Sequence, residues 1–109
     1  MFEGWVASEI TKHRLNRGQA RNLYYFRDKQ GLEVDFLLDQ GNRKLALLEA
    51  KATQTPMPDD ARALHRLANV ITGYDTTRFL VHAASRIQPQ LPLSNGVTAV
   101  DIRRLHSVL

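Results

Sequence analysis

The sequence predicts a mixed α/β domain of 109 residues: a helix, three strands, a second helix and a fourth strand, with a short strand-helix tail. Apolar residues recur every three or four positions at the start and in the middle of the chain, which indicates helices. Between these segments they recur at about every second position, as in strands. Short glycine-containing linkers separate the strand segments and favour antiparallel hairpins.

The first helix is expected over residues 2–15. An apolar stripe supports it, made of Phe2, Trp5, Val6 and Ile10. Gly18 is a plausible cap at its end. No capping residue precedes Phe2, so we expect residues 1–109 to be a single domain cut from a longer chain or beginning close to a domain edge.

Three strands follow, over residues 23–28, 32–39 and 43–52. The connecting linkers are Lys29-Gln30-Gly31 and Gln40-Gly41-Asn42. The third strand is apolar on both faces for part of its length, which predicts a place near the centre of the sheet, covered on both sides.

In the second half, a helix is expected from Asp59 to about Thr72, because apolar residues again recur at helical spacing. Residues 78–84 form the fourth expected strand, and two prolines mark a loop over residues 88–96. The tail consists of a strand at residues 97–100 and a final helix capped by Asp101.

Composition excludes several classes of protein. No cysteine is present, so disulfides and thiolate metal sites are ruled out. No apolar run approaches the length of about 20 residues that a membrane span needs, and the N-terminus does not resemble a secretion signal, so we expect a cytoplasmic protein. The four histidines lack metal-binding spacing and are expected to be exposed or hydrogen-bonded.

The net charge of +4 is concentrated in one segment. Asp28 is the only acid among its basic residues, which are Lys12, Arg14, Arg17, Arg21, Arg27 and Lys29. Such a cluster can neutralise nucleic-acid phosphates, and Arg14, Arg17, Arg21 and Arg27 are the candidate contacts. A solvated helix end and turn explain it equally well.

Three residues of the central strands are candidates for chemistry. Glu49 and Lys51 lie two apart and therefore point to the same face of their strand. If the preceding turn centres near Gly41, Asp35 lies opposite residues 47–49, where cross-strand Cβ atoms are about 5 Å apart. Asp35 and Glu49 can then share a cation, and a backbone carbonyl would complete a hard oxygen site suited to Mg²⁺ or Mn²⁺. Alternatively, Lys51 simply pairs with one of the two carboxylates.

Glu9 is the fourth candidate. With Trp5 counted in the apolar stripe, Glu9 falls in the middle of the stripe. A carboxylate there needs a partner, which could be a metal, Lys51 or an arginine.

The strings Gly31-Leu32-Glu33-Val34-Asp35-Phe36 and Glu49-Ala50-Lys51 resemble the signature of PD-(D/E)XK nuclease-like domains. The order of elements also resembles the restriction-endonuclease-like αβββαβ core of that family. The strings Phe2-Glu3-Gly4-Trp5-Val6 with Ser8-Glu9, and then Tyr25-Phe26-Arg27-Asp28, are similar to one branch. That branch is the uncharacterised domain at the C-terminus of many prokaryotic AAA-type ATPases.

The resemblance implies a nuclease that acts on DNA with Mg²⁺ or Mn²⁺. Asp35, Glu49 and the carbonyl of Ala50 would bind the metal, with Glu9 as the acidic residue of the first helix. Lys51 would position or activate the attacking water. Asp35, Glu49 and Lys51 would thus be the catalytic residues.

The sequence also departs from the family pattern. Val34 replaces the proline of the motif, and the second helix lacks the glutamine and tyrosine of the exonuclease branches. No phosphate-binding loop is present, so an ATPase domain would belong to the rest of the polypeptide or to a partner chain. One alternative is a non-catalytic DNA-binding or regulatory module of such an ATPase. Another is a homodimeric junction-resolving nuclease.

Overall fold

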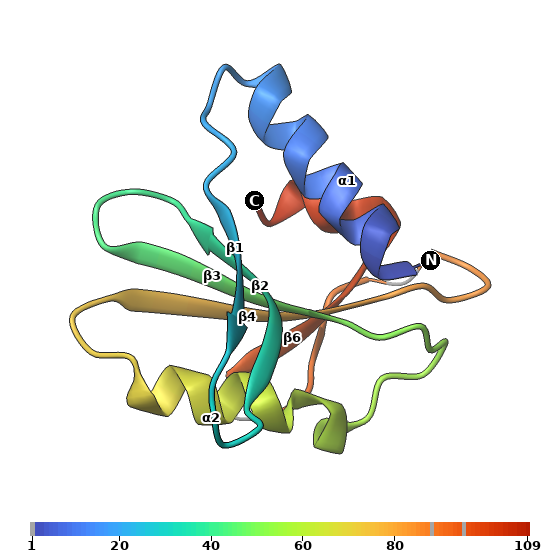
Figure 1. Cartoon of the computed structure of the whole chain (residues 1–109). Helices are drawn as coiled ribbons and strands as arrows, with labels where there is room; N and C mark the ends of the chain where they lie inside the picture. Colours follow the sequence, from blue (N-terminus) through green and yellow to red (C-terminus); the bar gives the residue numbers. More distant parts are fainter. Residues whose placement is uncertain (1, 88, 95) are drawn as a thin grey trace.

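The computed structural model describes residues 2–87, 89–94 and 96–109. A six-stranded mixed sheet with the strand order β1-β2-β3-β4-β6-β5 lies between helices on its two faces (Figure 1). The predicted mixed α/β class is therefore confirmed. Along the chain, the elements are α1 (Phe2–Asn16), β1 (Leu23–Arg27), β2 (Glu33–Asp39), β3 (Lys44–Ala50), the 3₁₀ turn η1 (Pro58–Ala61), α2 (Arg62–Val70), β4 (Asp75–His82), β5 (Leu91–Pro92), β6 (Val97–Asp101) and the 3₁₀ helix η2 (Ile102–Ser107).

Several boundaries differ from expectation. β4 begins at Asp75, three residues early, because its polar first residues pair in parallel with β3 from Lys44 onwards. Leu91–Pro92 forms a short strand inside the expected loop, whose Gln88 and Asn95 lie outside the described residues. The final helix is 3₁₀ rather than α, although Asp101 caps it as expected by accepting a hydrogen bond from the Arg103 N–H.

The β2–β3 turn fixes the register of the central hairpin. Its three residues Gly41, Asn42 and Arg43 have φ angles of 78°, 53° and 59°, so the chain reverses through left-handed conformations. In the resulting pairing, Phe36 lies opposite Leu48 and Leu37 opposite Leu47. The same register continued by one residue brings Asp35 opposite Glu49.

β3 occupies the centre of the sheet, as predicted. It pairs with β2 on one side in antiparallel fashion and with β4 on the other in parallel fashion. Its middle residues, Ala46, Leu47 and Leu48, are fully buried, which requires cover on both faces.

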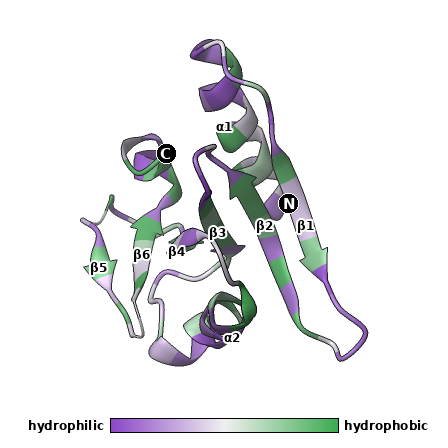
Figure 2. Cartoon of the chain, turned by 90° about the vertical axis from the view of Figure 1, so that its left-hand side faces the viewer, coloured by the Kyte–Doolittle hydropathy of each residue, from purple (hydrophilic) through white to green (hydrophobic). Residues whose placement is uncertain are grey.

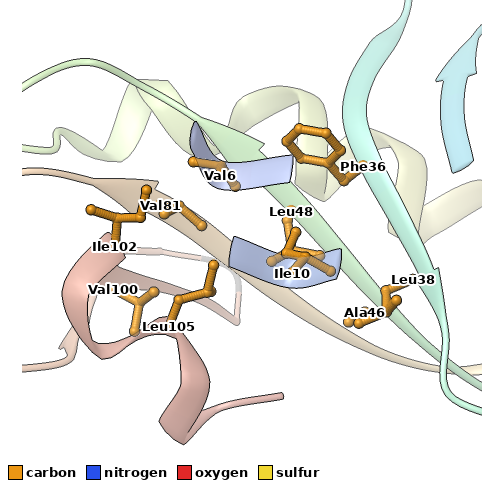
Figure 3. Close-up of a cluster of buried hydrophobic side chains, with 10 residues drawn as sticks. All are labelled: Val6, Ile10, Phe36, Leu38, Ala46, Leu48, Val81, Val100, Ile102 and Leu105. Carbon is orange, nitrogen blue, oxygen red and sulfur yellow. The ribbon is translucent and has the colours of Figure 1, made fainter. Parts of the chain in front are cut away.

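Two apolar clusters provide that cover, and Figure 2 shows the strands fanning out between α1 on one side and α2 on the other. The first cluster joins α1 and η2 to the sheet; its buried members are Val6, Ile10, Phe36, Leu38, Ala46, Leu48, Val81, Val100, Ile102 and Leu105 (Figure 3). The second joins α2 to the opposite face; its buried members are Leu32, Val34, Leu47, Ala61, Leu64, Leu67, Leu80 and Val97. Within the described ranges, no helix has the length and apolar character needed to cross a membrane.

Candidate functional site

Asp35 and Glu49 are in direct contact where β2 and β3 meet. The Asp35 N–H donates a hydrogen bond of 3.3 Å to Glu49 Oε1, and the Ala50 N–H donates one of 2.8 Å to Asp35 Oδ2. Since the N–H and C=O of one residue in a strand point to the same neighbour, the Ala50 carbonyl also belongs to this side of β3. The two strands therefore bring together the two carboxylates and the carbonyl predicted as a metal-binding set.

This pair of carboxyl groups holds a proton when no cation is bound. Burial, followed by a hydrogen bond with Asp35 and the charge of Asp35, raises the pKa of Glu49 to about 8. Two carboxylates this close cannot both be ionised without a compensating positive charge. The site therefore favours either a proton or a cation.

Glu3 is the acidic residue of α1 that lies against this pair. A hydrogen bond to the Asp35 side chain, and then the negative charge of Asp35, raises the pKa of Glu3. Glu9 lies elsewhere: its carboxylate is 3.8 Å from Lys12 Nζ and lines a different pocket, between α1 and η2. The structure thus does not bring Glu9 to the residues with which it was expected to share a metal.

The reason is the exposure of Trp5, which is 44% accessible and does not belong to the buried stripe. At about 100° per residue, a stripe without Trp5 passes close to Glu3 and leaves Glu9 about 100° away from its centre. The buried residues of α1 that define the stripe are Val6, Ile10 and Arg14. Glu3 lies three residues before Val6 and seven before Ile10, which is the spacing of one helix face, so the sequence could have identified it.

Lys51 follows β3 directly, and its N–H continues the parallel pairing by donating to the Val81 carbonyl at 2.9 Å. The expected alternation of side chains puts it on the same side of the strand as Glu49. Its ammonium group is exposed and lies 3.9 Å from Asp60 Oδ1 of η1. The ion pair recorded for Lys51 is thus with Asp60 and not with Asp35 or Glu49.

A hollow of about 430 Å³ lies beside the carboxylates. Its wall contains Glu3, Glu33 and Asp35 together with Tyr25 and Arg27. Arg27 Nε binds Glu33 Oε1 at 2.9 Å, so Glu33 is paired with arginine. Three acids against one arginine make this hollow electronegative.

Of the four arginines expected to contact nucleic acid, Arg14 is unsuited to that role. It is only 8% exposed, and its guanidinium donates to the carbonyls of Ala20 and Asp39 at 2.9 and 3.4 Å. Arg14 therefore fixes the end of α1 to the loop before β1 and to the end of β2. Arg17 and Arg21 are exposed, and Arg27 is exposed but paired with Glu33.

Three histidines differ from expectation in having a buried ring nitrogen without a hydrogen-bond partner among the described residues: His13, His65 and His82. His82 is only 3% exposed, its Nδ1 has no hydrogen-bond partner among the described residues, and burial lowers its pKa. His13 Nε2 is likewise buried without a described partner. Such burial could not be predicted from residue type, since histidine is common both inside and on the surface of proteins.

The donor set at Asp35 and Glu49 fits Mg²⁺ or Mn²⁺ in chemistry but is small. Among the residues that the structure describes, no group of three or more histidine, aspartate or glutamate side chains is arranged to hold a metal ion. Mg²⁺ commonly binds one or two carboxylates and keeps several waters, or takes substrate phosphates as its remaining ligands. Two carboxylates and a carbonyl therefore fit an ion that is completed by water and substrate.

Comparison with protein families gave one match. A family model described as "Domain of unknown function (DUF4143)" matches residues 1–105. The comparison with curated proteins found no match, and neither did the comparison with solved structures.

Proposed function

Given that the chain belongs to the DUF4143 family, whose function is unknown, we propose that it is a divalent-cation-dependent phosphodiesterase that acts on DNA. The contact between Asp35 and Glu49 is the observation that carries the proposal. Their hydrogen bonds to the backbone of the neighbouring strand orient both carboxylates, and the high pKa of Glu49 shows a need for positive charge. Perturbed carboxyl groups beside a hollow are typical of functional sites.

Each residue has a role in this proposal. Asp35, Glu49 and the Ala50 carbonyl hold Mg²⁺ or Mn²⁺, which when bound lowers the pKa of its water and polarises the scissile phosphate. Lys51 leaves Asp60, orients the attacking water and stabilises the negative charge that develops on the phosphate oxygens. Glu3 keeps the side of Asp35 that faces α1 electronegative.

The charge of the hollow explains why a cation is required. A phosphodiester is an anion and is repelled by the three acids that line the wall. Glu33 is already paired with Arg27, so a cation that neutralises Asp35 leaves Glu3 as the one uncompensated acid of the wall and opens the hollow, with Tyr25, to the substrate. Substrate binding is therefore expected only after the cation has bound.

The topology supports a restriction-endonuclease-like core. α1, the β1-β2-β3 meander, α2 and β4 follow in the order αβββαβ, with β4 parallel to β3. In this arrangement, the carboxylates lie where β2 and β3 diverge, and Lys51 lies at the carboxyl end of the central strand.

Cleavage of DNA tests the proposal. Purified protein is incubated with supercoiled plasmid, single-stranded DNA and branched DNA in Mg²⁺ or Mn²⁺. Nicking is expected to fall about 100-fold or more in Lys51→Ala and in Asp35→Asn, because each substitution removes charge from the reacting centre. Lys29→Ala, in the exposed β1–β2 turn, is the matched control and should cleave normally. Absence of cleavage of all three substrates with both metals contradicts the proposal.

One observation favours a second candidate, a non-catalytic DNA-binding or regulatory module of an AAA-type ATPase. The Lys51 ammonium is paired with Asp60, and Asp60 is itself fixed by accepting a hydrogen bond of 2.9 Å from the Met57 N–H. A lysine held in this way serves to fasten η1 to the end of β3. This candidate predicts that Asp60→Asn lowers stability as much as Lys51→Met does, and that neither the natural protein nor Asp60→Asn cleaves DNA.

A further inference from the structure

A second pocket, of about 410 Å³, lies between α1 and η2. None of the Asp35, Glu49 and Lys51 side chains lines it. Its size falls within the usual range for small-molecule sites, about 300–1,000 Å³. The lining residues that matter here are Trp5, Glu9, Lys12, His13, Arg103 and His106.

The charged wall of this pocket favours an anion. Glu9 is the only acid among its described lining residues. It lies 3.8 Å from the exposed Lys12 and is itself partly exposed, so the two make a weak ion pair. Arg103 is held by the buried Asp101, to which its Nε and Nη2 donate hydrogen bonds of 2.8 and 2.6 Å. Lys12, His13 and His106 therefore remain as the groups that can donate a hydrogen bond to an anion.

His13 lacks the partner that an anion would supply. Its Nε2 is buried and has no hydrogen-bond partner among the described residues. Burial, and then the positive charges of Arg17, His106 and Arg14, lower its pKa. An anion beside His13 would accept its hydrogen bond and offset the surrounding positive charge.

Trp5 provides an aromatic surface at the same pocket. It is 44% exposed, which is unusual for the largest apolar side chain. Phe2 contacts it in a T-shaped arrangement with ring centroids 5.9 Å apart, so this contact covers at most one face of the indole. The open face can stack on a planar base.

We propose that this pocket binds one nucleotide unit, with its phosphate at Lys12, His13 and His106 and its base against Trp5. Neither a bare phosphate nor an uncharged aromatic molecule uses both parts of the pocket. The unit is either a free mononucleotide or one nucleotide of a single strand. The pocket shares no residue with the carboxylate pair, so the inference is independent of the nuclease proposal.

Trp5 is the only tryptophan in the chain, so its fluorescence reports on the pocket directly. The protein is titrated with deoxyadenosine 5′-monophosphate, deoxyadenosine, inorganic phosphate and a short single-stranded oligonucleotide, and N-acetyltryptophanamide corrects for absorption by the bases. Saturable quenching by the monophosphate is expected, with binding at least about tenfold tighter than that of deoxyadenosine, because a hydrogen bond to a charged group is lost. If the oligonucleotide binds more than about tenfold tighter than the monophosphate, with steep salt dependence, the bound unit is one nucleotide of a single strand and not a free mononucleotide.

Matched variants localise the binding. Lys12→Gln and His106→Gln should each weaken binding of the monophosphate by about tenfold, since the first removes a positive charge and the second removes the imidazole from the phosphate. Lys29→Gln serves as the control for loss of one exposed lysine, and Asp35→Asn as the control for the carboxylate site. Both controls should bind as the natural protein does.

The affinity should also rise as the pH falls from about 8 to about 6, because a bound phosphate favours protonated histidine. The charged and titratable groups around His13 are Glu9, Lys12 and Arg14 from α1, Arg17 just after it, and Arg103 and His106 from η2. Equal binding of deoxyadenosine and its monophosphate overturns the proposal. So does the absence of saturable quenching at millimolar ligand, or quenching that Lys12→Gln and His106→Gln leave unchanged.

Discussion

At the scale of single residues, Glu49 has the most informative electrostatics. The unfolded chain releases its proton near a pKa of 4.5, whereas the folded protein retains it up to a pKa of about 8. Between these two values the folded state binds more protons than the unfolded state. The free energy of unfolding must therefore decrease as the pH rises through this window.

We predict a loss of about 2 kcal/mol in the free energy of unfolding between about pH 5 and about pH 8.5, without divalent cations. This is about half of what the full shift would give, because solvent screens the partly exposed Glu49. Glu49→Gln removes this titration, so its stability should vary much less over the same range. Urea unfolding at a series of pH values measures both proteins. Glu33→Gln is the control, because Glu33 is an exposed carboxylate paired with Arg27 and should keep the pH dependence of the natural protein. A natural protein whose stability is flat or rises over this range would contradict the proton held by Glu49.

Residue identity alone did not predict which charged side chains are available. Arg14 and Arg17 are the same residue type in the same basic segment, yet Arg14 is buried against two carbonyls and Arg17 is exposed. The difference depends on the direction in which α1 packs on the sheet, which is a tertiary property. The charge pattern of the sequence therefore predicted one arginine too many on the surface available to nucleic acid.

At the scale of elements, the central hairpin was the most predictable part of the site. Alternating apolar residues define the faces of β2 and β3, and the glycine-containing turn fixes where the chain reverses. Together these two facts were enough to place Asp35 near residues 47–49. The pairing of the polar start of β4 with β3 could not be foreseen, because Asp75, Thr76 and Thr77 have no apolar pattern.

Helix α1 was predicted in extent but not in orientation. Val6 and Ile10 were correctly expected on its buried face. Trp5 was expected there too but is exposed, and counting it shifted the expected face towards Glu9. Large aromatic residues are poor guides to a helix face when they border a pocket, as Trp5 does here.

Because the buried face of α1 passes close to Glu3 and not to Glu9, these two acids should differ in their effect on metal binding. Glu3→Gln should weaken Mn²⁺ binding by about threefold to tenfold, because it removes negative charge that is hydrogen-bonded to Asp35. Glu9→Gln, two turns away, should leave Mn²⁺ affinity unchanged. Calorimetric titration of both variants makes the comparison, and circular dichroism checks that α1 is retained. A larger loss in Glu9→Gln than in Glu3→Gln would reverse the assignment made here.

At the scale of the whole molecule, positive and negative charge are separated. The electronegative hollow at Asp35 contrasts with the exposed arginines after α1, while the net charge is +4. Such a distribution can attract a polyanion to the surface with the arginines. Its phosphate can enter the hollow at Asp35 only after a cation has bound.

Arg17 and Arg21 should therefore contribute to DNA affinity without contributing to chemistry. Their double substitution by alanine should reduce the slope of log affinity against log salt by about two, since each phosphate contact contributes about 0.9. Fluorescence anisotropy with labelled duplex DNA at several salt concentrations provides the slopes. Arg66→Ala on α2, which lies on the opposite face of the sheet from α1 (Figure 1), is the control and should not change the slope. An unchanged slope in the double variant would remove this surface from the DNA-binding account.

The central claim, that Asp35 and Glu49 hold a divalent cation, is tested most directly by calorimetric titration with Mn²⁺ at about pH 7 in two buffers of different ionisation enthalpy. Because Glu49 has a pKa of about 8 and must lose its proton to bind metal, about one proton should be released for each Mn²⁺ bound. Binding should disappear in Asp35→Asn, and Glu49→Gln should release no proton. Absence of Mn²⁺ binding, or binding that releases no proton and survives Asp35→Asn, would contradict the account.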